Sequence, residues 1–250
     1  MFRDVRDRDI VGRQGGFIAE GEVVLNVLAG APRLRARAVL IAAKRVERLG
    51  PLLTRFDAAV AIYAADQEVM DGIAGFPIHR GILAYGDKGT AISPEDLLSR
   101  VVDGAPVLVL FGIAHHDNIG GIFRNAAAFG AGGVILDETC CDPLYRKAIR
   151  VSVGAVLTVP FGRLRPGQDA VELLRGRGFT PLALSPGGAR PLARLRPPAK
   201  PAVLLGAEGP GLPGRILERS ETVAIPMAGA FDSLNVAVTS GIVLHHLTRD

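Results

Sequence analysis

Short apolar runs that alternate with helical segments fill the second half of the chain and restrict its fold class. Val107 to Phe111 is a continuous apolar run, which is typical of a parallel strand covered on both faces. This alternation predicts an α/β domain with a mainly parallel sheet and helices on both faces. We expect strands over residues 107–111, 133–136, 155–159, 180–184, 202–205 and 222–225, and helices over residues 118–129, 144–151, 169–177, 213–219 and 232–247.

The first part of the chain has its own strands and helices, which predict a smaller α/β domain. Apolar residues at helical spacing predict a first helix over residues 16–31, ending at Pro32. We expect a domain over residues 1–90, a linker over 91–104 and a second domain over 105–250. Within the first domain we also expect helices over residues 44–56 and 67–73 and strands over residues 38–42, 58–64 and 81–84.

Charge and apolar content limit the class of protein. The chain has 250 residues, a formal net charge of +4 and a pI near 9.4, which suits a polyanionic partner such as nucleic acid without requiring one. The first residues alternate in charge and lack the apolar centre of a signal peptide. The apolar runs have the length of strands, far short of a membrane span, so we expect no membrane partner.

The two cysteines of the chain, Cys140 and Cys141, are neighbours in the sequence. Adjacent cysteines rarely pair with each other, and two thiols without histidines at suitable spacing make a poor zinc site. We therefore expect both to be reduced, with no metal site, in a cytoplasmic protein.

A glycine-rich segment, Gly206-Ala207-Glu208-Gly209-Pro210-Gly211, follows an expected strand and precedes an expected helix. Glycines at such a turn permit positive φ angles and expose backbone groups that can bind an adenine edge or a phosphate. The segment lacks the Lys-Ser/Thr of a P-loop and the Gly-x-Gly-x-x-Gly of a dinucleotide site. The alternative is an ordinary glycine-rich turn between a strand and a helix.

Two further segments place polar residues beside expected strand ends. Ile225-Pro226-Met227 is followed closely by Ser233-Leu234-Asn235, at the start of the last expected helix. Either Ser233 caps that helix, or Ser233 and Asn235 both point into a site. Upstream, Asn118-x-Gly120-x-x-x-Arg124 lies where a strand leads into a helix; the alternative there is a capping asparagine and a surface arginine.

Taken together, in the order in which they occur along the chain, the three segments resemble the motifs of the SpoU (TrmH-type) branch of the knotted SPOUT RNA methyltransferases. The resemblance covers about residues 105–248. It implies methylation of a ribose 2′-hydroxyl with S-adenosylmethionine, a deep trefoil knot in the carboxy-terminal domain, and a homodimer formed through that domain. Phe17 to Gly21 and His79 to Gly81 resemble, more weakly, the family's small RNA-binding domain, which is similar to ribosomal protein L30e.

The resemblance also implies roles for individual residues. His115 and His116 depart from the family, which often has Asp-Pro or Asn-Pro before the first motif. Glu208 orients Arg124 or receives a bond from the partner subunit, unless it is only a solvated carboxylate at a helix start. The implied catalytic residues are Arg124, Asn118, Glu208, Asn235 and Ser233, and the implied cofactor-binding residues are Leu184, Ser185, Gly206, Gly209, Ile225, Met227 and Leu234.

The hypothesis that follows is methylation of a nucleotide in structured RNA, with ribosomal RNA favoured over transfer RNA. Because arginine stays protonated, we expect Arg124 to orient a phosphate and stabilise the 2′-oxyanion rather than act as a base.

The alternatives are a non-catalytic RNA-binding or ribosome-assembly factor and a nucleotide-binding enzyme of ordinary doubly wound type. The basic residues offered for RNA contact are Arg33, Arg35, Arg37, Lys44, Arg45, Arg48, Arg146, Lys147, Arg150, Arg190, Arg194 and Arg196.

Overall fold

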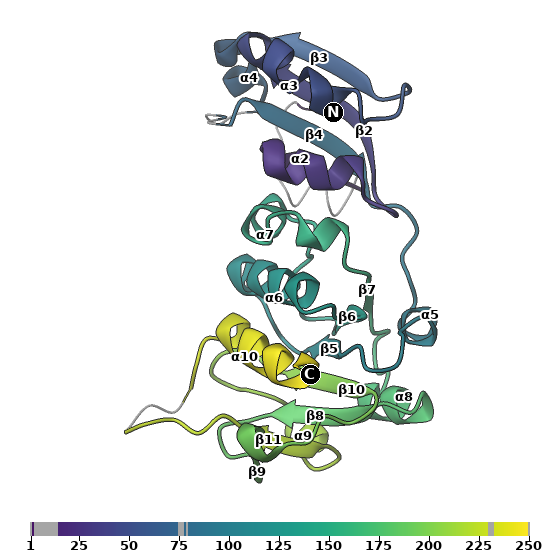
Figure 1. Cartoon of the computed structure of the whole chain (residues 1–250), viewed down its shortest axis with the longest axis vertical. Helices are drawn as coiled ribbons and strands as arrows, with labels where there is room; N and C mark the ends of the chain where they lie inside the picture. Colours follow the sequence, from purple (N-terminus) through teal and green to yellow (C-terminus); the bar gives the residue numbers. More distant parts are fainter. Residues whose placement is uncertain (1, 3–14, 75–77, 79, 230–232, 250) are drawn as a thin grey trace. The chain divides into compact units, whose positions relative to one another are not determined.

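The computed structural model describes residues 2, 15–74, 78, 80–229 and 233–249 (Figure 1). The chain divides into two compact units. The first contains Met1–Thr90 together with Asp142–Thr158, and the second contains Ala91–Cys141 together with Val159–Asp250. The chain therefore leaves the second unit once, to complete the first, before it returns.

The second unit is built on a seven-stranded sheet in which every pair of neighbouring strands is parallel. The order across the sheet is β7-β6-β5-β10-β8-β11-β9. This confirms the mainly parallel sheet that the sequence predicts. The strands are β5 (Val107–Leu110), β6 (Gly133–Leu136), β7 (Phe161–Arg163), β8 (Thr180–Leu184), β9 (Arg190–Pro191), β10 (Pro201–Leu205) and β11 (Glu221–Ala224).

Helices cover both faces of this sheet because its central strands are apolar on both sides. Val107 and Val109 belong to a core cluster that includes residues of α5 (Pro94–Ser99), α8 (Ala170–Gly176) and α9 (Gly214–Leu217). Leu108 and Leu110, which alternate with them, are also fully buried. On the other side lie α6 (His116–Ala128) and α10 (Val236–Thr248), which pack against β6 and β10 (Figure 1).

The first unit has a four-stranded sheet with the order β1-β4-β2-β3, in which only β2 and β3 are parallel. The inserted segment contributes a helix, α7, that contacts β1, and Gly154, whose position touches Val27. The elements are β1 (Gly16–Glu20), α2 (Glu22–Ala29), β2 (Arg35–Ala42), α3 (Val46–Leu53), β3 (Ala61–Ala65), α4 (Gln67–Ala74), β4 (Ile82–Asp87) and α7 (Arg146–Val151).

The structure corrects two sequence-based predictions of secondary structure. The helix over residues 16–31 is wrong: Gly16–Glu20 is a buried strand paired with β4, and Gly21, at φ 94°, turns the chain into α2. The strand over residues 155–159 is also wrong. Ala155–Leu157 forms a 3-10 helix after Gly154 turns the backbone at φ 88°, and the strand follows at Phe161–Arg163.

The described residues form neither a membrane-spanning helix nor a metal-binding cluster. None of the helices drawn from them has the length and apolar character needed to cross a bilayer. They also contain no group of three or more His, Cys, Asp or Glu side chains placed to hold a metal ion.

Candidate functional site

The carboxyl ends of three neighbouring strands of the second unit, β8, β10 and β11, border one pocket of about 340 Å³. Leu184 and Leu205 end β8 and β10, and Val223 lies next to the end of β11. The loop after each strand and the segment leading into α10 complete the wall. Ligands bind at this edge of open parallel sheets, so the pocket lies where the fold favours a site.

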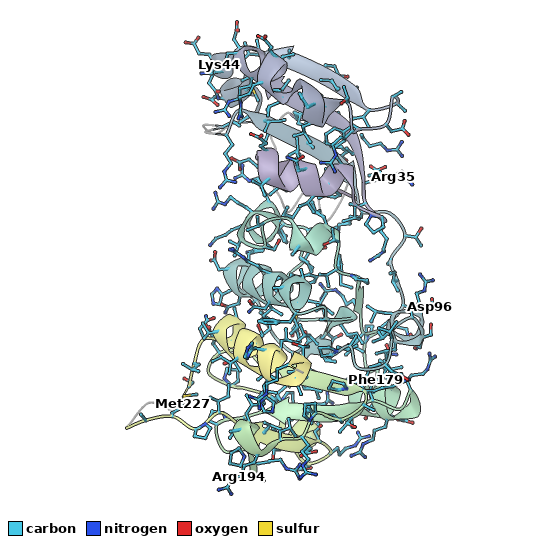
Figure 2. The ribbon with its side chains drawn as sticks, in the orientation of Figure 1. Arg35, Lys44, Asp96, Phe179, Arg194 and Met227 are labelled. Atoms are coloured by element: carbon cyan, nitrogen blue, oxygen red, sulfur yellow. The ribbon has the colours of Figure 1, made fainter. Side chains whose placement is uncertain are left out.

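All the residues that the sequence suggested for cofactor binding line this pocket. They come from three loops and from the segment before α10; Met227, on the segment after β11, is labelled in Figure 2. Glu208 and Ser233, suggested as catalytic, line it too. The residues that the structure gathers here are Leu184, Ser185, Gly206, Gly209, Ile225, Met227 and Leu234.

The pocket also has walls that sequence reasoning missed. Val236 and Thr239, in the first turn of α10, line it, as does Pro186 after β8. Residues three apart on a helix share a face, so the spacing from Val236 to Thr239 is a signal that could have found the second of them. Pro186 follows Ser185 directly and lines the pocket because the same loop does.

The glycine loop after β10 folds back on itself. A Cβ atom on Gly206 would lie 2.2 Å from the backbone carbon of Gly211, so no side chain fits there. The amide of Gly211 donates to the carbonyl of Ala207 at 3.0 Å, and Gly209 has φ 89°. At its three lining glycines, Gly206, Gly209 and Gly211, the loop therefore presents bare backbone to the pocket.

Three polar side chains from the three sequence segments meet at one point. Asn118 and Asn235 each donate from Nδ2 to Oε1 of Glu208, both at 3.0 Å. Asn235 Nδ2 also donates to Oδ1 of Asn118 at 2.9 Å. Asn118 is buried, whereas Glu208 is exposed. This amide–carboxylate cluster joins the first turn of α6, the glycine loop and the start of α10.

Asn235, rather than Ser233, is the residue that caps α10. The closing helix was expected over residues 232–247, with Ser233 as its candidate cap. The helix instead begins at Val236, and Asn235 Oδ1 accepts bonds from the amides of Ala237 and Val238. A capping asparagine needs a non-helical backbone, and Asn235 has φ −50° and ψ 136°. The same side chain thus caps α10 and joins the cluster.

Arg124, the candidate for charge stabilisation, stands apart from this cluster. It is exposed on α6, and within the described part of the chain it makes no ion pair or side-chain hydrogen bond. Six residues separate it from Asn118, which places the two about a third of a turn apart around the helix. The structure therefore brings Asn118, Glu208 and Asn235 together and leaves the Arg124 guanidinium available to another molecule.

A second asparagine of α6, Asn125, holds α10. Asn125 Nδ2 donates to the carbonyl of Ala237 at 2.7 Å and to Oγ of Ser240 at 2.9 Å. Asn118 and Asn125 are seven residues apart, so they share one face of α6. Asn125, like Asn118, thus joins α6 to the start of α10.

A second carboxylate organises the loop after β5. Asp137 accepts bonds from the amides of Gly112, Thr139 and Cys140 and from the Thr139 hydroxyl. Burial acts to raise the pKa of Asp137, but these hydrogen bonds outweigh it and hold the pKa below its usual value. Burial, aided by the charge of Asp137, raises the pKa of the Cys140 thiol to about 12. Cys140 is therefore a protonated, structural thiol.

The loop after β5, which Asp137 holds through the amide of Gly112, also contacts the wall of the pocket. Gly112 has φ 68°, and a Cβ atom there would lie 3.2 Å from the Cβ of Ala207 in the glycine loop. The loops after β5 and β10 are thus in contact where these two neighbouring strands end.

Known proteins resemble this chain along nearly its whole length. The chain is 37% identical over 261 residues to an uncharacterized tRNA/rRNA methyltransferase of Mycobacterium tuberculosis, covering 99% of this chain and 87% of that protein. An AdoMet-bound rRNA methyltransferase from Sinorhizobium meliloti has the same fold, with a TM-score of 0.81 and 22% identity over 96% of this chain and 92% of that one.

A third similarity concerns mainly one part of the chain. A protein solved in work on 2-OH methylation of C/U34 on tRNA aligns with a TM-score of 0.50 and 28% identity, covering 58% of this chain and 97% of that one. The sequence model of the SpoU rRNA Methylase family matches residues 105–245, which hold the pocket, the amide–carboxylate cluster and Arg124. The chain is a methyltransferase of the SpoU rRNA methylase family.

Proposed function

We propose that this protein transfers a methyl group from S-adenosylmethionine to a ribose 2′-hydroxyl in structured RNA, with ribosomal RNA favoured and transfer RNA as the second candidate. The observation that carries the proposal is the pocket at the ends of β8, β10 and β11, with the amide–carboxylate cluster beside it. The 28% identical relative studied for 2-OH methylation on tRNA supports the ribose as the target.

The pocket fits a molecule of the cofactor's size and chemistry. About 340 Å³ lies within the range of small-molecule sites. Leu184, Ile225 and Leu234 offer apolar surface for an adenine ring, and the glycine loop offers backbone groups for its polar edge. When bound, S-adenosylmethionine supplies an electrophilic methyl group on a sulfonium.

The residues of the chain hold the pocket in shape and position the ribose. The amide–carboxylate cluster fixes α6, the glycine loop and α10 to one another, so that the pocket keeps its shape before RNA arrives. Ser233 lines the pocket in the segment just before the helix cap and shapes that wall. Asn118 and Asn235 position the ribose, and Glu208, which is exposed, holds the amides of both.

Arg124 acts on the developing charge. Its guanidinium binds the phosphate next to the target ribose and stabilises the negative charge that forms on the 2′-oxygen. Because arginine stays protonated in proteins, the proton of the hydroxyl goes to a phosphate oxygen or to water. The exposure of Arg124 supports this role, since the side chain is available to a strand of RNA.

We also propose a homodimer formed through α10 and a cytoplasmic location. The helix α10 is apolar around most of its circumference, and Val238 and Ile242, one turn apart, are 52% and 39% exposed. An apolar helix face of this kind favours burial against another surface. Neither Cys140 nor Cys141 forms a disulfide in the part of the chain that the structure describes, which favours a reducing compartment.

Calorimetric titration with S-adenosylmethionine and S-adenosylhomocysteine tests the proposal first. We expect both to bind the wild-type protein, and Leu234→Arg, which places a long cation in the pocket, to abolish binding. Ribose-methylation mapping of ribosomal RNA from a deletion strain then identifies the nucleotide. If the protein binds the cofactor but the deletion strain loses no methyl group from its ribosomal or transfer RNA, the non-catalytic RNA-binding factor is favoured instead.

A further inference from the structure

The first unit has a pocket of its own, of about 760 Å³. It lies between the end of α2, the start of β2, the loop before β3 and the end of β4. None of these elements belongs to the site described above. Its lining includes Arg35, Arg37, Phe56 and Asp87 (Arg35 is labelled in Figure 2).

The pocket exists because β2 is longer than its neighbour β3. The two strands pair only from Ala38, opposite Ala61, onward. Before Ala61 the chain makes a turn in which the amide of Val60 donates to the carbonyl of Asp57 at 2.9 Å and the amide of Ala59 to its carboxylate at 2.8 Å. Residues of this turn line the pocket together with the first residues of β2.

A β-bulge interrupts β2 beside this pocket. In the pairing of β2 with β4, Arg35 is opposite Asp87 and Ala36 opposite Gly86, but the next pair is Ala38 with Tyr85. Arg37 is thus the extra residue, and bulges of this kind re-aim side chains. Arg35, Ala36 and Arg37 all line the pocket.

One of the two arginines is committed to a neighbour and the other is not. The Arg37 guanidinium forms an ion pair with the carboxylate of Asp87. Arg35 is exposed and makes no ion pair or side-chain hydrogen bond within the described ranges of the chain. The pocket therefore has an ion pair on its wall and an exposed guanidinium at its edge, unpaired among the described residues.

We propose that this pocket binds one unstacked nucleotide of the RNA substrate. This inference rests on the proposed function. The Arg35 guanidinium binds the nucleotide's phosphate, because its planar fork matches phosphate oxygens. The ring of Phe56, which is half-buried in the wall, stacks on the base, and Leu34 and Val60 add apolar surface around it.

The composition of the chain supports this placement. Proteins that select bases in RNA use unstacked bases and aromatic side chains, and this chain has no Trp, three Tyr and ten Phe. The pocket combines one of these few aromatic rings with an exposed arginine. Its volume lies within the range typical of small-molecule sites, as a single nucleotide requires.

The experiment measures binding of a short fluorescein-labelled single-stranded RNA of mixed sequence to the full-length protein over a series of salt concentrations. Phe56→Leu keeps an apolar side chain but removes the ring; we expect at least about fivefold weaker binding with an unchanged salt slope. Arg35→Ala should weaken binding and lower the salt slope by about 0.7 to 0.9, one phosphate contact. Arg100→Ala, which removes an exposed arginine of the second unit, is the matched control and should change neither.

Two readouts separate this inference from the proposed function. Thermal unfolding and S-adenosylmethionine binding report on the folding of each variant and on the second unit. Folded Phe56→Leu and Arg35→Ala variants that bind RNA like wild type, or that lose no more than Arg100→Ala, would overturn the nucleotide pocket and leave the methyltransferase proposal intact. Pocket variants that lose RNA while the wild type fails to bind the cofactor would support the pocket and overturn the proposed reaction.

Discussion

Gly121 of α6 lies directly against Ala237 of α10: a Cβ atom on Gly121 would come 2.7 Å from the Cβ of Ala237. Real side chains do not approach so closely, so the two helices can cross here only because residue 121 is glycine. The contact lies between Asn118 and Asn125, whose side chains bond residues at the start of α10. The crossing therefore sets where α10 begins, and with it one wall of the pocket.

The first prediction is that Gly121→Ala destabilises the protein by about 1–3 kcal/mol, because the added methyl group overpacks the crossing. The change in the free energy of unfolding is measured by urea denaturation. Gly50→Ala in α3 is the control: nothing lies within 4 Å of its Cβ position, so the same substitution should be neutral or stabilising. Equal effects at both positions would contradict the close approach.

The second prediction concerns Asn125. Removing its amide in Asn125→Ala leaves the buried Ser240 hydroxyl without one of its partners and should cost about 1–3 kcal/mol. Cofactor binding should also weaken, because the first turn of α10 lines the pocket. Asn26→Ala, which removes bonds to Glu22 and Arg55 on the first unit, should leave cofactor binding unchanged. Calorimetry of the two variants side by side makes the comparison.

The third prediction separates chemistry from binding at Arg124. In Arg124→Ala we expect methyl transfer to fall by about 10²- to 10³-fold, because a donor that stabilises charge in the transition state is lost. Binding of S-adenosylmethionine should be unchanged, since Arg124 does not line the pocket. Arg124→Lys keeps the charge without the planar fork and should recover only part of the rate. A loss of cofactor binding in Arg124→Ala would refute this separation.

The fourth prediction concerns the acceptor at the centre of the amide–carboxylate cluster. Glu208→Ala removes the shared acceptor of Asn118 and Asn235, and leaving the buried Asn118 amide unsatisfied should cost about 1–3 kcal/mol. Glu208→Gln retains an acceptor oxygen and should recover most of that stability. If the two variants unfold at the same urea concentration as wild type, the cluster does not hold the three segments together.

The fifth prediction is a pH dependence at Asp137. Hydrogen bonds from its loop lower the folded-state pKa below the unfolded value of about 3.9. The bonds to the ionised carboxylate therefore contribute stability that is fully present above the unfolded pKa and is lost as the pH falls through the folded pKa. The difference in unfolding free energy between wild type and Asp137→Asn should be constant near neutral pH and shrink below about pH 4. A difference that grows on acidification would contradict the assignment.

Continuous apolar runs made parts of the fold predictable. The strands at Gly133–Leu136 and Thr180–Leu184 have the predicted bounds, since each run is apolar and bounded by turn or polar residues. Residues 16–31 show how the same reasoning fails. Their apolar residues satisfy a helical period, but Gly21 divides them, and pairing with β4 fixes the first five as a strand. Pairing partners from the far end of a domain leave no local signal.

The site was predictable in its parts rather than in its geometry. Strand ends followed by glycine, proline or serine located the pocket residues, because the carboxyl ends of parallel strands share one edge. The bonds from Asn118 to Glu208 and to Asn235 cross 90 and 117 residues, and no spacing rule reaches that far. The passage of the last strands through an earlier loop stays a prediction from the resemblance.

The segment Asp142–Thr158 belongs to the first unit although the chain has by then begun the second. During synthesis, the first unit therefore lacks the whole of residues 142–158, α7 among them, until residue 158 has left the ribosome, long after residue 90. A protease cut between Thr90 and Ala91 divides the first unit between two fragments rather than releasing it whole. Gene fragments meant to yield separate domains would have to follow this interrupted boundary, and a fragment ending at residue 90 would expose the surface of β1 that α7 covers.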